Sequence, residues 1–105
     1  MYKQLSHAEA KDLIGHLDLI VADVRDEESF NAAHIDGAIH LTMATLNEFC
    51  DNSDKTKPIL VYCYHGLSSQ SVAQHLIDQG FAEVYSLIGG FEAWSAYQSS
   101  REDEI

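Results

Sequence analysis

The amino-acid sequence predicts an α/β fold, a single domain with a central parallel β-sheet of about five strands and helices on both faces. Short β-branched and apolar runs alternate along the chain with segments whose apolar residues recur at helical spacing. The apolar runs lack a strict polar alternation, which is typical of strands buried on both faces. No linker or repeat divides the 105 residues, a length that suits one domain. We therefore expect one domain over residues 1–105, with a short flexible acidic tail from about residue 99.

The first predicted elements are a short edge strand and a helix. Residues 2–5 are expected to form the strand. Ser6 and Glu9 have the spacing of a capping box, in which the two side chains satisfy backbone N–H groups at a helix start. The next helix places four apolar residues on one face, namely Ala10, Leu13, Ile14 and Leu17.

Two strands with a short helix between them are predicted next. Residues 19–24 are a β-branched apolar run of strand length. Asp26 precedes two glutamates and can cap a short helix that ends near Ala33, since acidic residues suit a helix start. Residues 38–41 indicate another short strand, which the chain enters through a turn at Asp36-Gly37.

A third helix and the most apolar strand come after these. Thr42 or Thr45 is expected to open the helix. Pro58 stands at the first residue of the next strand, 59–62, where the missing N–H has the least effect. The apolar face of the helix is expected to hold Met43, Leu46, Phe49 and Cys50.

The last third of the chain predicts a helix, a strand and a final helix. Ser68 or Ser69 is expected to cap the first of these helices, and Gly80 to end it as the residue after the C-cap. Residues 83–87 form the last strand, and Gly89-Gly90 leads into the final helix. The buried residues of the two helices are expected to be Val72, Ala73, Leu76, Ile77, Phe91 and Trp94.

Cys63 lies directly after the strand 59–62 and before the helix that begins near Ser68. In folds of this class the ligand site lies beyond the carboxyl ends of the strands. The free N–H groups and the positive dipole of a helix start favour a thiolate over a thiol. Because the thiolate is the attacking form of cysteine, the sequence indicates an enzyme with Cys63 as its nucleophile.

Four segments have a characteristic order and spacing, namely Asp23-Val24-Arg25, residues 34–40, residues 63–69 and residues 89–94. Together they resemble the single-domain rhodaneses, most closely the GlpE-type thiosulfate sulfurtransferases. The likeness covers nearly the full length of the chain. Many rhodanese loops carry an arginine where this chain has Ser68. The GlpE-type loop is similarly free of arginine, so this difference narrows the subgroup and leaves the family assignment intact.

The resemblance implies a double-displacement mechanism without a metal or a cofactor. The Cys63 thiolate would attack the outer sulfur of thiosulfate, expel sulfite and retain a persulfide. Cyanide, or a dithiol such as thioredoxin, would then accept the sulfur. Backbone N–H groups of the loop would stabilise the anionic sulfur. The expected substrate-binding residues are Tyr64, His65, Gly66, Leu67, Ser68 and Ser69.

Individual loop residues have separate expected roles. Gly66 permits a positive φ if the turn requires one. The hydroxyls of Ser68 and Ser69 are each able to donate, although a plain helix-capping role is at least as good an interpretation for one of them. Tyr64 is expected to shape the rim of the pocket. The charge of His65 could tune the site, and we expect no direct proton transfer by it.

Three other functions compete with the sulfurtransferase. A cysteine phosphatase or arsenate reductase uses a similar strand, loop and helix, with an arginine at the end of the loop that clamps the oxyanion. Ser69 holds that position here, and residues 58–90 contain no arginine. A non-catalytic binding module would be expected to lack the nucleophile, which is present. A persulfide carrier for one dedicated biosynthetic partner would use the same intermediate, so this alternative stays open.

Composition excludes several other classes. The 17 acidic residues exceed the 6 Lys and Arg residues and give a formal net charge of −11, which disfavours binding to nucleic acid or to an anionic membrane surface. No apolar run is long enough to span a membrane, and the start of the chain lacks a signal-peptide core. Two widely spaced cysteines are no disulfide framework. We therefore expect a cytoplasmic protein, a monomer or a weak dimer.

Several other reactive residues have a structural interpretation. Cys50 falls on an apolar helix face and is expected to be a buried, inert thiol. Asp23 and Arg25 are expected to form a structural pair between a strand end and a neighbouring loop. His34 and His40 have no companion cysteines, which makes a zinc site a poor interpretation.

Overall fold

The computed structural model describes residues 1–16 and 18–103, and it confirms the predicted α/β fold with one parallel sheet. The five strands stand in the order β1-β5-β4-β2-β3, and every neighbouring pair is parallel. The strands are β1 (Lys3–Leu5), β2 (Ile20–Asp23), β3 (Ile39–His40), β4 (Ile59–Tyr62) and β5 (Val84–Leu87). The helices are α1 (His7–His16), α2 (Glu27–Ala32), α3 (Leu46–Asn52), α4 (Ser68–Asp78) and α5 (Gly90–Asp103).

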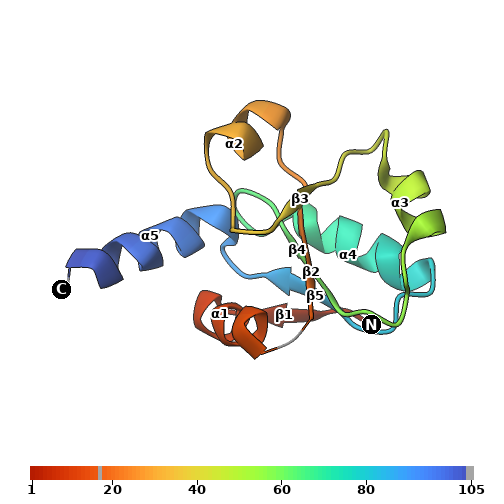
Figure 1. Cartoon of the computed structure of the whole chain (residues 1–105), viewed down its shortest axis with the longest axis horizontal. Helices are drawn as coiled ribbons and strands as arrows, with labels where there is room; N and C mark the ends of the chain where they lie inside the picture. The colour runs from red at the N-terminus through yellow and green to blue at the C-terminus, as the bar shows by residue number, and fades with distance from the viewer. Residues whose placement is uncertain (17, 104–105) are drawn as a thin grey trace.

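Helices cover both faces of the sheet. Figure 1 shows the sheet nearly edge-on, with α1 and α5 to one side and α3 and α4 to the other. The central strand β4 is fully buried, and its side chains alternate between two apolar clusters. Ile59 and Val61 pack in the cluster with α3 and α4, whereas Leu60 and Tyr62 pack in the cluster with α1 and α5. This two-sided burial explains why the strand has no polar alternation.

The predicted helix signals are largely confirmed. Ser6 and Glu9 form the capping box, since each side chain accepts a hydrogen bond from the other residue's backbone N–H, at 3.2 and 3.1 Å. The Asp26 side chain caps α2 by accepting from the Ser29 N–H. Gly80 follows the C-cap of α4 with a φ of +102°. The predicted apolar contact of Leu17 lies outside the described residues.

The prediction for α3 is wrong at its start. Met43 was expected on the buried face of this helix, but α3 begins at Leu46 and Met43 is 81% exposed. The physical reason is a local turn in which Thr42 and Thr45 accept each other's backbone N–H at 3.1 and 3.2 Å. Thr45 occupies the N-cap position, but its side chain forms no capping hydrogen bond. Leu46 and Cys50 are buried as expected.

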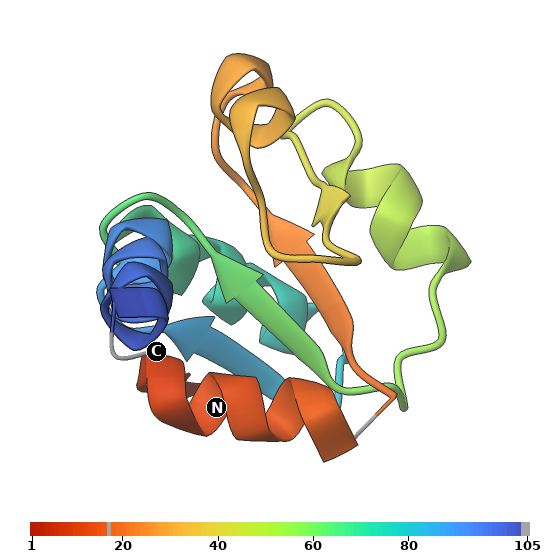
Figure 2. The ribbon, with the colours of Figure 1, turned by 60° about the vertical axis from the view of Figure 1, so that its left-hand side comes forward.

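The last described residues of the chain are helical. The backbone of α5 is helical to Asp103, and residues 104–105 lie outside the described part. The flexibility expected from about residue 99 stays a prediction. Figure 2 shows the start of α5 beside the carboxyl end of β4, which is where the candidate site lies.

Candidate active site

Cys63 directly follows β4, at the carboxyl edge of the sheet. It is a free thiol and only 6% exposed. The chain leaves the sheet here, passes through a short loop and enters α4 at Ser68. The most buried strand of the protein therefore fixes the position of the sulfur, and the loop closes over it from one side.

The start of α5 supports the back of this loop. The Phe91 N–H donates to the Cys63 carbonyl at 2.8 Å, and the Glu92 N–H donates to the Tyr64 carbonyl at 3.1 Å. A Cβ at Gly90 would lie 2.5 Å from both of these carbonyl oxygens. A Cβ at Gly66 would lie 2.7 Å from the Gly89 nitrogen. Glycine at these positions allows the two backbones to approach this closely.

Within the described part of the chain, two hydrogen bonds involve the Cys63 sulfur. The Gly66 N–H donates to Sγ at 3.1 Å, and the Cys63 thiol donates to Ser69 Oγ at 3.4 Å. The turn requires a positive φ at Gly66, which is +91°, and glycine permits this conformation. The hydrogen-bond partners of the sulfur thus come from the loop backbone, which donates, and from one serine of the first turn of α4, which accepts from the thiol.

The pKa of Cys63 is lower than that of an ordinary cysteine. Burial alone would raise the pKa, because it disfavours the charged form. Hydrogen bonds from the Ser69 side chain and from the backbone of Ser69, Gly66 and His65 act in the opposite direction and together prevail. Neutral donors of the loop and helix start therefore favour the thiolate.

Ser69 is fully buried and does not cap α4. Leu67 holds the N-cap position, and no side chain there makes a capping hydrogen bond, so the predicted cap by Ser68 or Ser69 is wrong. The Ser69 hydroxyl instead lies between Cys63 and Ser86, with an Oγ–Oγ distance of 2.8 Å to Ser86. The sequence reasoning missed Ser86, although a serine within the otherwise apolar strand β5 was a signal for a partner inside the fold.

The remaining loop side chains point outward. Tyr64 and Leu67 are exposed, the latter by 75%. His65 is exposed as well, and its Nδ1 lies 2.6 Å from Glu92 Oε2 at the start of α5. Ser68 is exposed, and neither of the two hydrogen bonds at the Cys63 sulfur involves it. The structure therefore brings Gly66 and Ser69 to the sulfur, and leaves the other four predicted residues to act through their backbone or at the rim.

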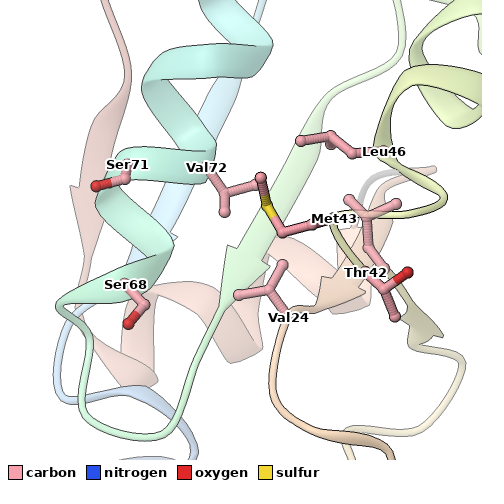
Figure 3. A pocket seen from close by; sticks show the side chains of 8 residues that line it. Val24, Thr42, Met43, Leu46, Ser68, Ser71 and Val72 are labelled. Carbon is pink, nitrogen blue, oxygen red and sulfur yellow. The ribbon is translucent and has the colours of Figure 1, made fainter.

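An uncharged hollow lies beside the loop, between α4 and the segment before α3. Figure 3 shows Val24, Met43 and Val72 converging on it, with Ser68 at its edge. Its volume is about 360 Å³, within the usual range for small-ligand sites. The lining residues are Val24, Leu41, Thr42, Met43, Leu46, Ser68, Ser71 and Val72.

The Asp23–Arg25 pair has the predicted structural position. Arg25 Nη2 lies 2.7 Å from Asp23 Oδ2, and both side chains are almost completely buried. The same nitrogen donates to the Ala33 carbonyl at 2.6 Å, and the guanidinium lies 4.2 Å from the centre of the Phe91 ring. The pair thus joins the end of β2 to the end of α2 and to α5.

The other candidate residues lie in packed surroundings. Cys50 is buried in the cluster with α3 and α4, as predicted, and burial raises the pKa of its thiol. His34 and His40 both stack on Phe30, with ring centres 4.0 and 4.9 Å away. Within residues 1–16 and 18–103, no three His, Cys, Asp or Glu side chains are placed to hold a metal ion. Over the same residues, no helix has the length and apolarity to cross a membrane.

Comparison with known proteins agrees with this geometry. The sequence model of the protein family described as rhodanese-like domain matches residues 6–97 of this chain. A protein of Coxiella burnetii named thiosulfate sulfurtransferase GlpE is 59% identical over 97% of this chain and 95% of its own length. A protein of the same name from Pseudoalteromonas translucida is 41% identical over 95% of both chains. A rhodanese-like domain from Anabaena has a TM-score of 0.82 at 27% identity, and the match covers 92% of this chain and 76% of that one.

The fold and the site define a single-domain α/β protein with a free, activated cysteine after its central strand. The chain belongs to the rhodanese family, and the two bacterial relatives compared with it are of the GlpE type.

Proposed function

We propose that this protein is a thiosulfate sulfurtransferase that carries sulfane sulfur on Cys63. The observation that carries the proposal is the hydrogen bonding of the Cys63 sulfur by the Gly66 N–H and the Ser69 hydroxyl, in a loop without arginine. Relatives up to 59% identical have the name thiosulfate sulfurtransferase. The lowered pKa of Cys63 supports attack by a thiolate at neutral pH.

The reaction proceeds in two displacements. The Cys63 thiolate attacks the outer sulfur of thiosulfate, a new S–S bond forms, and the old S–S bond breaks. Sulfite leaves with the electron pair of that bond, and Cys63 becomes a persulfide. In the second step a nucleophile attacks the terminal sulfur, and Cys63 leaves as a thiolate. The N–H groups of Tyr64 through Ser69 would stabilise the anionic sulfur in both steps.

The acceptor that we propose is a thiol, with cyanide as the acceptor in an assay. A dithiol protein such as thioredoxin would suit the cycle. Its first thiol would take the sulfur as a persulfide, and its second thiol would attack the inner sulfur, expel sulfide and leave a disulfide on the acceptor. The uncharged hollow beside the loop offers such an acceptor contact without like-charge repulsion from the acidic surface. A reducing cytoplasm belongs to the same proposal, since Cys63 must stay a free thiol. The proposal also includes a monomer or a weak dimer.

The alternatives differ from this proposal in the fate of the persulfide or in its absence. A persulfide carrier for one partner would perform the first displacement and release sulfur only to that partner. A phosphatase would need a free guanidinium at the loop. Arg25 is bonded to Asp23 and only 5% exposed, so it does not supply one. A non-catalytic binding module would form no persulfide.

Intact-mass spectrometry before and after thiosulfate tests the proposal. We expect a gain of about one sulfur atom, lost again on addition of cyanide or of reduced thioredoxin, as for a covalent cysteine catalyst. Cys63→Ser is the control that should gain nothing. If the added sulfur remains on the protein in the presence of either acceptor, that result would favour the persulfide carrier. Aryl phosphate hydrolysis that disappears in Cys63→Ser would overturn the sulfurtransferase assignment.

A further inference from the structure

Ser86 is a buried hydroxyl that reaches the reactive sulfur through one other hydroxyl. Its Oγ lies 2.8 Å from Ser69 Oγ, which in turn lies 3.4 Å from Cys63 Sγ. Ser69 and Ser86 are fully buried, and Cys63 nearly so. The three groups come from the end of β4, the first turn of α4 and strand β5. They form a hydrogen-bonded chain inside the fold, which we call the hydroxyl chain.

We propose that Ser86 is a positioning residue that holds the Ser69 hydroxyl as a donor to the Cys63 thiolate. This inference rests on the proposed function, because it takes Cys63 as the nucleophile. Among the described residues, the two hydrogen bonds at the sulfur involve Gly66 and Ser69 and not Ser86, so the proposed effect of Ser86 passes through Ser69.

The number of protons fixes the direction of the chain. Each serine hydroxyl carries one proton, and a thiolate carries none. For the Ser69–Cys63 hydrogen bond to persist when Cys63 is ionised, Ser69 must donate its only proton to the sulfur. The Ser69 oxygen is then available as an acceptor, and Ser86 becomes the donor to it. When Cys63 is a thiol, its S–H donates to Ser69, as in the present geometry, and the proton of Ser69 is free to be donated to Ser86.

Burial makes this arrangement consequential for the thiolate. A charge in a poorly solvated site needs donors, and hydrogen-bonded groups in such a site polarise one another. Without Ser86, the Ser69 hydroxyl would keep its proton but lose the partner that favours rotation toward the sulfur. We therefore expect the thiolate to be less favoured in a variant that lacks the Ser86 hydroxyl.

The neighbouring titratable groups stay unchanged in such a variant. His65 lies on the loop and Glu92 on α5, and these two exposed side chains contact each other at 2.6 Å. The influences on the pKa of Cys63 are burial and neutral hydrogen-bond partners, namely Ser69 on α4 and the backbone of Gly66 and His65 on the loop. A change in the titration of Cys63 on removal of Ser86 can thus be assigned to the hydroxyl chain.

The test is the rate of Cys63 alkylation by iodoacetamide as a function of pH, followed by mass spectrometry of the Cys63 peptide from the full chain. The variants are Ser86→Ala, Ser69→Ala and the double variant. We expect Ser86→Ala to move the midpoint to higher pH and to slow alkylation below the midpoint about two- to fivefold, with the rate at high pH unchanged. Ser69→Ala should have a larger effect, and the double variant should match Ser69→Ala.

A matched pair separates the hydroxyl from the packing. Ser86→Thr keeps the hydroxyl, whereas Ser86→Val has the shape of the Thr variant but lacks the hydroxyl. The Thr variant should keep the original midpoint, and the Val variant should behave like Ser86→Ala. Because two variants lack the hydroxyl, the measurement is still possible if one of them folds poorly. Gln74→Ala, at an exposed position of α4, is the control that should change nothing.

An unchanged midpoint in Ser86→Ala and Ser86→Val would overturn the proposal. Equal effects of Ser86→Ala in the presence and absence of the Ser69 hydroxyl would also overturn it, because Ser86 would then act by another route. Alkylation reports the thiolate whether or not sulfur is transferred. A shifted midpoint in a protein without sulfurtransferase activity would therefore contradict the proposed function and leave the role of Ser86 intact.

Discussion

The two cysteines show how residue environment decides reactivity. Both are free and almost completely buried, but Cys63 lies where a strand meets a helix start and Cys50 lies within an apolar cluster. The pKa of Cys63 is lowered by surrounding donors, whereas burial raises the pKa of Cys50. Donor groups at the sulfur, and not exposure, therefore distinguish the two thiols.

We expect Cys63→Ser to abolish sulfur transfer with the fold intact, because a serine alkoxide is not accessible at neutral pH. Cys50→Ser should keep its activity and lose about 1–3 kcal/mol of unfolding free energy, since it buries a hydroxyl in an apolar cluster. Thiosulfate:cyanide turnover and urea denaturation measure the two effects. An inactive Cys50→Ser beside an active Cys63→Ser would show that the site assignment is wrong.

The lowered pKa of Cys63 predicts a pH dependence. The thiolate fraction rises as pH increases through the pKa of Cys63, so the persulfide-forming half-reaction should accelerate with pH and then level off. The plateau should begin at lower pH than for an ordinary cysteine, whose pKa is about 8.5. Single-turnover persulfide formation at several pH values measures this dependence. The pH dependence of Cys63 alkylation in the unfolded protein gives the reference for an ordinary cysteine. A rate that still climbs steeply at the pKa of an ordinary cysteine would contradict it.

At the scale of elements, the loop after β4 depends on the start of α5. The first N–H groups of α5 bond the Cys63 and Tyr64 carbonyls, and the two backbones approach where only glycine fits. The carboxyl end of β2 is similarly joined to α2 and α5 through Arg25. The site is therefore rigid through contacts between elements and not through the loop sequence alone.

We expect Gly90→Ala to lower sulfurtransferase kcat/KM by about a hundredfold, because its Cβ would displace the Cys63 carbonyl and with it the sulfur. Gly37→Ala is the matched control: its φ is also positive, at +82°, but a Cβ there meets nothing within 4 Å. Both variants should lose about 1–3 kcal/mol of unfolding free energy from backbone strain. Equal kcat/KM values for the two variants would show that α5 does not hold the loop.

The Asp23–Arg25 pair predicts a loss of stability when only one partner is removed. Arg25→Met would leave the fully buried Asp23 carboxylate without its guanidinium, which costs about 3–5 kcal/mol in comparable buried pairs. The double variant Asp23→Leu/Arg25→Met should recover part of that loss, since no unpaired charge remains. Urea denaturation of the two variants is the measurement. A double variant no more stable than Arg25→Met would mean that the guanidinium acts mainly through its contacts with Ala33 and Phe91.

At the scale of the whole molecule, the charge distribution opposes an anionic substrate. The formal net charge is −11, and no Lys or Arg occurs between residues 58 and 90. Lys55 and Lys57 precede β4, so they lie toward the edge of the parallel sheet opposite Cys63. Loop N–H groups attract thiosulfate only at short range, whereas the long-range field repels it.

We therefore expect weak thiosulfate binding, with KM at or above the upper end of the usual range of about 1 μM to 1 mM. Inert salt should raise kcat/KM modestly at first, since the Debye length falls from about 30 Å at 0.01 M to about 10 Å at 0.1 M. Ser68→Arg should lower KM by supplying a local positive charge, and Ser68→Gln is its uncharged control. A steep fall of kcat/KM with salt in the unmodified protein would instead indicate a locally positive mouth.

The sequence by itself determined the fold class, the strand positions and Cys63 as the candidate nucleophile. These depend on local patterns, since apolar runs, helical spacing and the position of a cysteine after a strand need no knowledge of distant contacts. The sequence did not predict the exposure of Met43. The apolar spacing places Met43 on the helix, but the reciprocal Thr42–Thr45 hydrogen bonds form a turn there, and α3 begins only at Leu46.

Only the tertiary structure decided which groups surround the sulfur. Ser69 looked like a helix cap, and its burial against Cys63 depends on Ser86, which is 17 residues away in the chain. The closeness of Gly90 to the Cys63 carbonyl likewise depends on how α5 packs against the loop. Such contacts join segments that are distant in sequence, and side-chain direction at a helix start is set by the packing of those segments, so no local pattern encodes them.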